Sequence, residues 1–178
     1  MRKLRMDELN RPDTATFKRM PKHPVVVVLD NIRSLNNIGS IFRTADALAA
    51  EKLYLTGFTA TPPHKDIHKT ALGATESVDW EYVADIRTLL SRLKNENMLI
   101  AAVEQTDSSV FLQDFRPPQD RKTVLIFGNE VKGVSDEALE MADVALEIPQ
   151  FGTKHSFNVA VSAGIVLWDI ISKLKYGR

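Results

Sequence analysis

Residues 25–49 read VVVVLDNIRSLNNIGSIFRTADALA, and this stretch decides the fold. Its first five residues are Val or Leu, a composition typical of a strand that is covered on both faces of a sheet. From Ile38 onward the apolar residues recur at helical spacing, and Asn36 or Asn37 is the expected N-cap of that helix. A buried strand followed directly by a helix is the repeating unit of an α/β fold.

The same alternation continues along the rest of the chain. Short apolar runs predict further strands at residues 52–56, 78–83, 98–103, 123–127 and 144–148. Helices are expected at 64–72, after Asp85, after Ser135 and at 157–174. This order predicts an α/β domain with a mainly parallel sheet and helices on both faces. Because ligands of such sheets bind beyond the carboxyl ends of the strands, the loops of interest are 30–39, 103–109, 128–134 and 149–156.

The composition indicates an ordinary globular protein. The chain has 178 residues, of which 44% are hydrophobic and 26% charged, and these values exclude disordered and fibrous classes. We expect a basic N-terminal arm over residues 1–22 and one domain over 23–178. The absence of cysteine excludes disulfides, thiol nucleophiles, iron–sulfur clusters and cysteine zinc sites. No secretory or membrane-spanning segment is found, because the apolar stretch 157–171 is short and interrupted by polar residues, so we expect a cytoplasmic protein.

The formal net charge is zero, but the charges are unevenly distributed. Residues 1–22 carry seven basic and three acidic residues, a net charge of +4. Residues 172–178 carry a net charge of +3, and the body between these ends carries −7. A zero total argues against a nucleic-acid partner, whereas clustered bases are what phosphate contacts require. Two interpretations of the basic ends stay open at this point: a solvated surface, or a site of RNA contact.

Several common site types lack their defining residues. The loop 128–135 has two glycines at P-loop spacing, but Val134 stands where a P-loop needs Lys. No Gly-x-Gly-x-x-Gly follows a strand, and no Gly-x-Ser-x-Gly nucleophile turn is present. His64 and His68 are four residues apart, but the glutamate of a zinc protease motif is missing at Lys65. We therefore expect no metal site.

Polar residues in three of the strand-end loops remain as candidates. They are Asn37 and Arg43, Asn129 and Glu130, and Ser156 and Asn158. Each also has a structural interpretation: Arg43 could pair with a carboxylate, Glu130 could cap a loop, and Ser156 could be the N-cap of the last helix. Asn158 lies in an apolar segment that we expect to be helical, and it needs a hydrogen-bond partner there because an unpaired buried amide is costly.

Three segments that contain these residues resemble motifs of one family. They are NNIGSIFRTA at 36–45, LIFGNEVKGV at 125–134, and IPQ at 148–150 followed by SFNVAVS at 156–162. In this order and spacing they resemble the SpoU (TrmH-type) RNA methyltransferases of the SPOUT superfamily. Phe157 and Ala160 depart mildly from the residues usual in the third motif. The resemblance covers about residues 24–174.

The resemblance implies a fold, a cofactor and an assembly. The fold is the SPOUT fold, an α/β domain with a C-terminal trefoil knot, and the protein is a homodimer whose active site lies at the knot. S-adenosylmethionine is held by three loops, and the positions that match its binding site are Val103, Glu104, Gly128, Asn129, Ile148, Pro149 and Phe157. The partners are the second subunit and RNA, with no membrane and no metal.

The implied reaction is methyl transfer to a ribose 2′-hydroxyl of structured RNA, either tRNA or rRNA. The matching catalytic positions are Arg43, Glu130, Ser156, Asn158 and Asn37. A ribose hydroxyl must lose its proton during transfer, and the family gives this role to the arginine. Because an Arg side chain is normally protonated, we expect Arg43 to position the phosphate and ribose; whether it also becomes the base once RNA is bound stays open.

Two alternatives have other functions: a catalytically silent RNA-binding member of the same fold, and an enzyme that uses the same cofactor on a small molecule. Intact Arg43, Glu130 and Asn158 argue against the silent member. The sequence does not identify the RNA or the nucleotide that is methylated.

Overall fold

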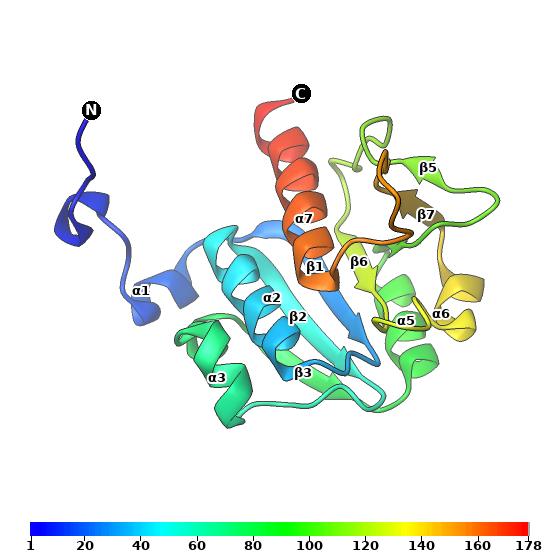
Figure 1. The fold of residues 1–178 in the computed structure, drawn as a ribbon, viewed down its shortest axis with the longest axis horizontal. Helices are drawn as coiled ribbons and strands as arrows, with labels where there is room; N and C mark the ends of the chain where they lie inside the picture. The colour runs from blue at the N-terminus through cyan, green and yellow to red at the C-terminus, as the bar shows by residue number, and fades with distance from the viewer. Residues whose placement is uncertain (178) are drawn as a thin grey trace.

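The computed structural model describes residues 1–177 and contains a seven-stranded sheet in the order β3-β2-β1-β6-β4-β7-β5 (Figure 1). Every pair of neighbouring strands is parallel, which confirms the predicted sheet. The strands are β1 His23–Asp30, β2 Ala50–Thr56, β3 Trp80–Val83, β4 Leu99–Val103, β5 Val110–Phe111, β6 Thr123–Phe127 and β7 Val144–Glu147. The short edge strand β5 was not predicted, because two residues carry no periodicity.

Helices cover both faces of this sheet, as the sequence predicts. Side chains of a strand alternate between its two faces, so Val25, Val27 and Leu29 of β1 pack into one core while Val26 and Val28 pack into the other. The first core lies under α2 Leu35–Ala47, α3 Lys65–Ala71, α4 Ala74–Ser77 and α7 Val159–Tyr176, and the second lies under α5 Ile86–Asn95 and α6 Asp136–Met141.

The caps of two helices differ from the predictions. Helix α2 begins after Ser34, whose Oγ accepts a hydrogen bond from the N–H of Asn37 at 3.3 Å, so the prediction of Asn36 or Asn37 as N-cap was wrong. Helix α7 begins after Asn158, whose Oδ1 accepts from the N–H groups of Ala160 and Val161. Asn158 is therefore an exposed N-cap and not a buried helical residue, and Ser156 lies outside the helix. A side-chain oxygen that satisfies the first free N–H groups decides where a helix starts.

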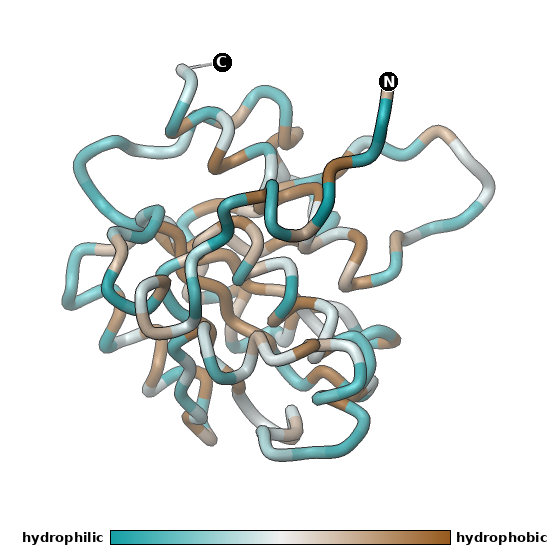
Figure 2. The backbone as a smooth tube through the Cα atoms, turned by 90° about the vertical axis from the view of Figure 1, so that its left-hand side faces the viewer, coloured by the Kyte–Doolittle hydropathy of each residue, from teal (hydrophilic) through white to brown (hydrophobic). Residues whose placement is uncertain are grey.

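The N-terminal arm contains two short helices, η1 Met6–Leu9 and α1 Thr14–Arg19. The carboxylate of Asp13 caps α1 by accepting from the N–H of Thr16 at 2.7 Å. The arm lies at the left of Figure 1, where α1 contacts α4. Figure 2 views the molecule from this side, so that the arm crosses in front of the domain.

Within residues 1–177, no helix has both the length and the apolar composition that a membrane crossing requires. In the same residues, no three His, Asp or Glu side chains are grouped so that they could hold a metal ion. His64 instead caps α3, because its Nδ1 accepts a hydrogen bond from the N–H of Asp66 at 3.2 Å.

Candidate active site

The loops that follow β4, β6 and β7 enclose a pocket of about 680 Å³ at the carboxyl edge of the sheet. Most residues of the predicted cofactor set line it, namely Val103, Glu104, Gly128, Asn129, Ile148 and Phe157. Three predicted catalytic residues also line it: Glu130, Ser156 and Asn158. The residue that the structure separates from this set is Pro149, which lines a neighbouring groove beside Trp168 of α7.

The loop after β6 is held in place by hydrogen bonds of Asn129. Asn129 and Gly133 exchange two backbone hydrogen bonds, each 2.9 Å long. The side chain of Asn129 accepts from the N–H groups of Val131 and Lys132 and donates to the carbonyl of Asn31 at 2.7 Å. All of its side-chain polar atoms are thus engaged within the protein, so Asn129 shapes the pocket wall. Gly128 admits no side chain, because a Cβ there would lie 2.1 Å from the backbone N of Val134.

Two carboxylates at strand ends anchor this loop to the sheet. Asp30, at the end of β1, is only 1% exposed and accepts from the N–H of Ser135 at 2.8 Å. Glu104, directly after β4, accepts from the N–H of Val134 at 3.0 Å. Asp30 was not among the predicted residues, although its sequence signal was an acidic residue that directly follows a buried strand. Glu104 was predicted to bind the cofactor, and its carboxylate is committed to the loop.

Glu130, Asn37 and Asn158 form a hydrogen-bonded cluster that joins the three motifs. The Glu130 carboxylate accepts from the N–H groups of Arg33 and Ser34 and from the amide of Asn37, each at 2.9 Å. The Oδ1 of Asn37 accepts in turn from the amide of Asn158 at 3.2 Å. Residues up to 121 positions apart in the sequence are therefore brought to one edge of the pocket. The sequence predicted these residues as site members but not their mutual contacts.

The Glu130 side chain is held in its ionised form. Burial alone would raise its pKa, but hydrogen bonds from the Arg33 N–H, the Asn37 amide and the Ser34 N–H outweigh burial and lower the pKa below its usual value. A carboxylate in this state is a poor proton acceptor near neutral pH. Its geometry suits it to hold the start of α2 and to orient Asn37.

This ionisation predicts a dependence of stability on pH. A carboxylate whose pKa is lower in the folded than in the unfolded state stabilises the fold at pH values above its unfolded pKa of about 4.3. This stabilisation is lost as the pH falls through the lower, folded-state pKa. We expect Glu130→Gln to lower the urea midpoint at pH 7, since an amide cannot accept from all three donors. The difference from the original protein should shrink below about pH 4. A difference that stayed constant from pH 7 to pH 3 would contradict this assignment.

Arg43 does not reach this cluster within one chain. It lies on the exposed side of α2, and no hydrogen bond or ion pair of its side chain occurs within residues 1–177. It follows Asn37 by six residues, which is about 9 Å along the helix and away from the carboxyl edge of the sheet. The single chain thus brings together Asn37, Glu130, Ser156 and Asn158 but leaves Arg43 outside the pocket.

Comparison with known proteins identifies the family. The model of the SpoU rRNA Methylase family matches residues 24–168. The chain belongs to this family. It is 33% identical over 151 residues to a tRNA (guanosine(18)-2′-O)-methyltransferase of Aquifex aeolicus, and the alignment covers 82% of this chain and 67% of that protein. The resemblance stated on the three motifs is therefore confirmed.

Solved structures support the same assignment. The crystal structure of the A. aeolicus TrmH/SpoU tRNA modifying enzyme matches with a TM-score of 0.80 and 28% identity, and covers 92% of this chain and 81% of that chain. The AdoMet-bound rRNA methyltransferase from Sinorhizobium meliloti matches with a TM-score of 0.78 and 25% identity, and covers 88% of this chain and 59% of that chain. The chain spans from 51% to 67% of the length of the curated relatives it matches.

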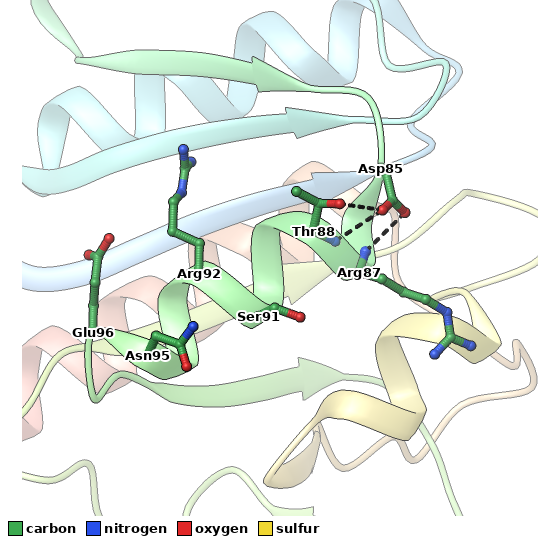
Figure 3. Close-up of a pocket in the computed structure, with 7 residues that line it drawn as sticks. All are labelled: Asp85, Arg87, Thr88, Ser91, Arg92, Asn95 and Glu96. Carbon is green, nitrogen blue, oxygen red and sulfur yellow. Dashed lines mark hydrogen bonds between the residues drawn. The ribbon is translucent and has the colours of Figure 1, made fainter.

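A second hollow lies along α5, and its charged residues have structural roles as a helix cap and in ion pairs. Figure 3 shows its residues, which include Asp85, Arg87 and Arg92. Asp85 caps α5 through the N–H groups of Arg87 and Thr88, Arg87 pairs with Glu140 at 2.7 Å, and Arg92 pairs with Glu81 at 2.9 Å. No strand-end loop of the three motifs lines it. The hollow therefore lies apart from the motif pocket.

Proposed function

We propose that this chain transfers the methyl group of S-adenosylmethionine to a ribose 2′-hydroxyl of tRNA or rRNA. The observation that carries the proposal is the Asn37–Glu130–Asn158 cluster, which joins all three motifs of the SpoU family at one edge of a pocket. Relatives named as methyltransferases of both RNA classes support the substrate class, one for tRNA guanosine 18 and one for 23S rRNA guanosine.

The pocket has the size and chemistry to hold S-adenosylmethionine. Its volume of about 680 Å³ falls within the range of cofactor sites. Val103 and Ile148 offer apolar surface to an adenine ring, and Asp136 and Glu147 place carboxylates in the wall that suit a cationic ligand. When bound, the cofactor supplies an electrophilic methyl group on a sulfonium. The backbone of the loops after β4, β6 and β7 would hold it.

The residues of the cluster then act on the RNA. Ser156 lines the pocket and orients the ribose, while Asn158, whose side chain caps α7 and donates to Asn37, holds Asn37 at the pocket edge. Glu130 is already ionised and fully hydrogen-bonded, so it positions Asn37 and the start of α2 instead of accepting the proton. The guanidinium of Arg43 can donate two hydrogen bonds to two oxygens of one phosphate, and in this way Arg43 positions the backbone of the RNA. A protonated guanidinium has no lone pair for a proton, so Arg43 would act as the base only in the bound complex and only after giving up one of its own protons.

We infer that two copies of the chain form the active unit and that Arg43 serves the pocket of the partner. Helix α7 leaves an apolar strip uncovered, in which Val161 is 51% and Trp168 is 59% exposed. Between them a Cβ at Gly164 would meet no atom within 4 Å, so a partner helix has room to approach closely there. Helices α2 and α7 contact one another, and a second copy seated on α7 would therefore also lie against α2 and its Arg43.

The C-terminal trefoil knot is part of the proposal. Strand β6 lies between β1 and β4, although β4 precedes it in the chain, and α7 returns from β7 to the face covered by α2. This crossing order is compatible with passage of the C-terminal part of the chain through a backbone loop, as the family resemblance implies.

A labelling experiment tests the activity. Labelled S-adenosylmethionine is incubated with the protein and with tRNA and rRNA from cells that lack it, and the product is mapped by mass spectrometry of nuclease digests. We expect one 2′-O-methylated nucleotide in one RNA class. Measurable cofactor binding without label in any RNA would reject the proposal and favour the silent RNA-binding alternative.

The basic arm supplies a separate prediction. Deleting residues 1–22 removes a net charge of +4 and should weaken RNA binding while cofactor affinity is kept, because the arm does not line the pocket. For each lost phosphate contact, the slope of log K against log salt should become shallower by about 0.7 to 0.9. Filter binding at several salt concentrations measures this slope. An unchanged slope would mean that the arm is only a solvated surface.

A further inference from the structure

We propose that the exposed face of α3 is a second RNA-binding surface, which holds the backbone of the substrate beside the active site. The inference rests on the proposed function, and its occupant is the phosphate backbone of the same RNA. The face carries Lys65, His68 and Lys69, which follow one another at helical spacing and are all exposed. Buried Ile67 and Ala71 form the opposite face of the helix.

Helix α3 is fixed to the helix that carries Arg43. A Cβ at Gly39 of α2 would lie 2.1 Å from the Oγ1 of Thr70 and 2.3 Å from the carbonyl oxygen of Ile67, so the two helices touch at a residue without a side chain. The Oγ1 of Thr70 also donates to the carbonyl of Asn36 at 3.0 Å. Arg43 lies one turn beyond Gly39 on α2, and it borders this contact between the helices.

The start of α3 lies at the same edge of the sheet as the pocket. The loop that leads into it leaves the carboxyl end of β2, the neighbour of β1. The Oγ1 of Thr59 in this loop accepts a hydrogen bond at 2.9 Å from the N–H of Ile32, next to the residues that contact Glu130. An RNA chain that reaches the pocket can therefore run along α3 without bending around the molecule.

The charges on the two faces of the sheet are arranged differently. On the α5 side the bases are neutralised in ion pairs, as with Arg87 and Glu140 at 2.7 Å and Lys94 and Asp143 at 3.0 Å. Arg87 and Arg92 are seen on that side in Figure 3. On the α3 side, Lys65, Lys69 and Arg43 form no ion pair within residues 1–177, so their charge is available to a polyanion.

Acidic groups near α3 limit the surface to one face of the helix. Asp66 is in its first turn, and Glu76 is in the following helix α4. In Figure 1, α3 and the basic arm lie on the same side of the domain, and α1 contacts α4. The arm and α3 therefore border a common side of the molecule, the side viewed in Figure 2. This arrangement suits a long RNA backbone better than a small anion.

The test compares two double variants of the full chain. Lys65→Ala with Lys69→Ala removes two unpaired bases, and Arg87→Ala with Lys94→Ala removes two paired bases from the α5 side. Binding to purified tRNA and, separately, to rRNA is measured across a salt series, together with thermal melting and affinity for S-adenosylmethionine. For the RNA class that is the substrate, we expect the α3 variant to make the salt slope shallower by about 1.4 to 1.8, as for two lost phosphate contacts.

The α5 variant should leave this slope unchanged, and both variants should keep their melting temperature and cofactor affinity. An α3 variant with the slope of the original protein would overturn the inference. Equal effects of the two variants would also overturn it, because a general loss of charge would then explain the result. If the original protein methylated no RNA, the proposed function itself would fail, and that result would be visible before any variant was made.

Discussion

Arg43→Ala is expected to lower the rate of RNA methylation by a factor of at least about 100, the range found when one positioned donor is removed from an active site. The guanidinium is exposed on α2 and contacts no carboxylate within residues 1–177, so its loss should leave folding intact. It also does not line the pocket that we propose for the cofactor, so affinity for S-adenosylmethionine should stay within about twofold. Single-turnover methylation and calorimetric cofactor binding measure the two effects.

Arg43→Lys and Arg87→Ala provide matched controls. Lysine keeps the charge but not the planar fork, so it should restore RNA binding more fully than the methylation rate. Arg87 pairs with Glu140 on the α5 side, and its removal should change neither quantity. A methylation rate for Arg43→Ala close to that of the original protein would remove Arg43 from the mechanism and leave the pocket cluster to act without it.

The central strands were predictable because each is a continuous run of apolar residues in the sequence. Residues 123–127 were predicted as a strand and form β6 with the same limits, since Thr123 and Phe127 bound a run that is buried on both faces. The helix starts were less predictable. Asn36 or Asn37 was predicted as the N-cap by propensity alone, but Asn37 donates its side-chain amide to Glu130, and Ser34 caps α2. N-cap propensity ranks residue types, but it does not decide which of several neighbouring Ser and Asn residues caps the helix.

The sequence predicted candidate residues of the site but not the contacts between them. Motif resemblance identified Glu130 and Asn158, but a sequence contains no information on which amide donates to which carboxylate across more than 90 residues. Asp30 was missed because none of the three motif segments contains it, although it directly follows a run of buried apolar residues. Pro149 stays a prediction, since it lines the neighbouring groove while Ile148 beside it lines both that groove and the motif pocket.

Mixing two inactive variants should restore activity if Arg43 serves the partner's pocket. In a mixed dimer, one chain carries Arg43→Ala and an intact pocket, while the other carries Asn158→Ala and an intact Arg43. The intact pocket then receives the intact arginine, whereas the other pocket lacks both groups. After random exchange of equal amounts, half the dimers are mixed and each has one complete site, so about one quarter of the original activity should return in a two-fold symmetric assembly.

The mixing experiment distinguishes an Arg43 that acts in the partner's pocket from one that acts in the pocket of its own chain. In the second case no methylation activity should return. Each pocket of the mixed dimer would then lack either Arg43 or Asn158. Exchange is verified by tagging one variant and purifying the mixed dimer through its tag. Trp168→Glu provides the second check, since a charge in the exposed apolar strip of α7 should dissociate the dimer and abolish the recovery. A monomeric protein with full methylation activity would instead show that Arg43 moves into the pocket of its own chain when RNA binds.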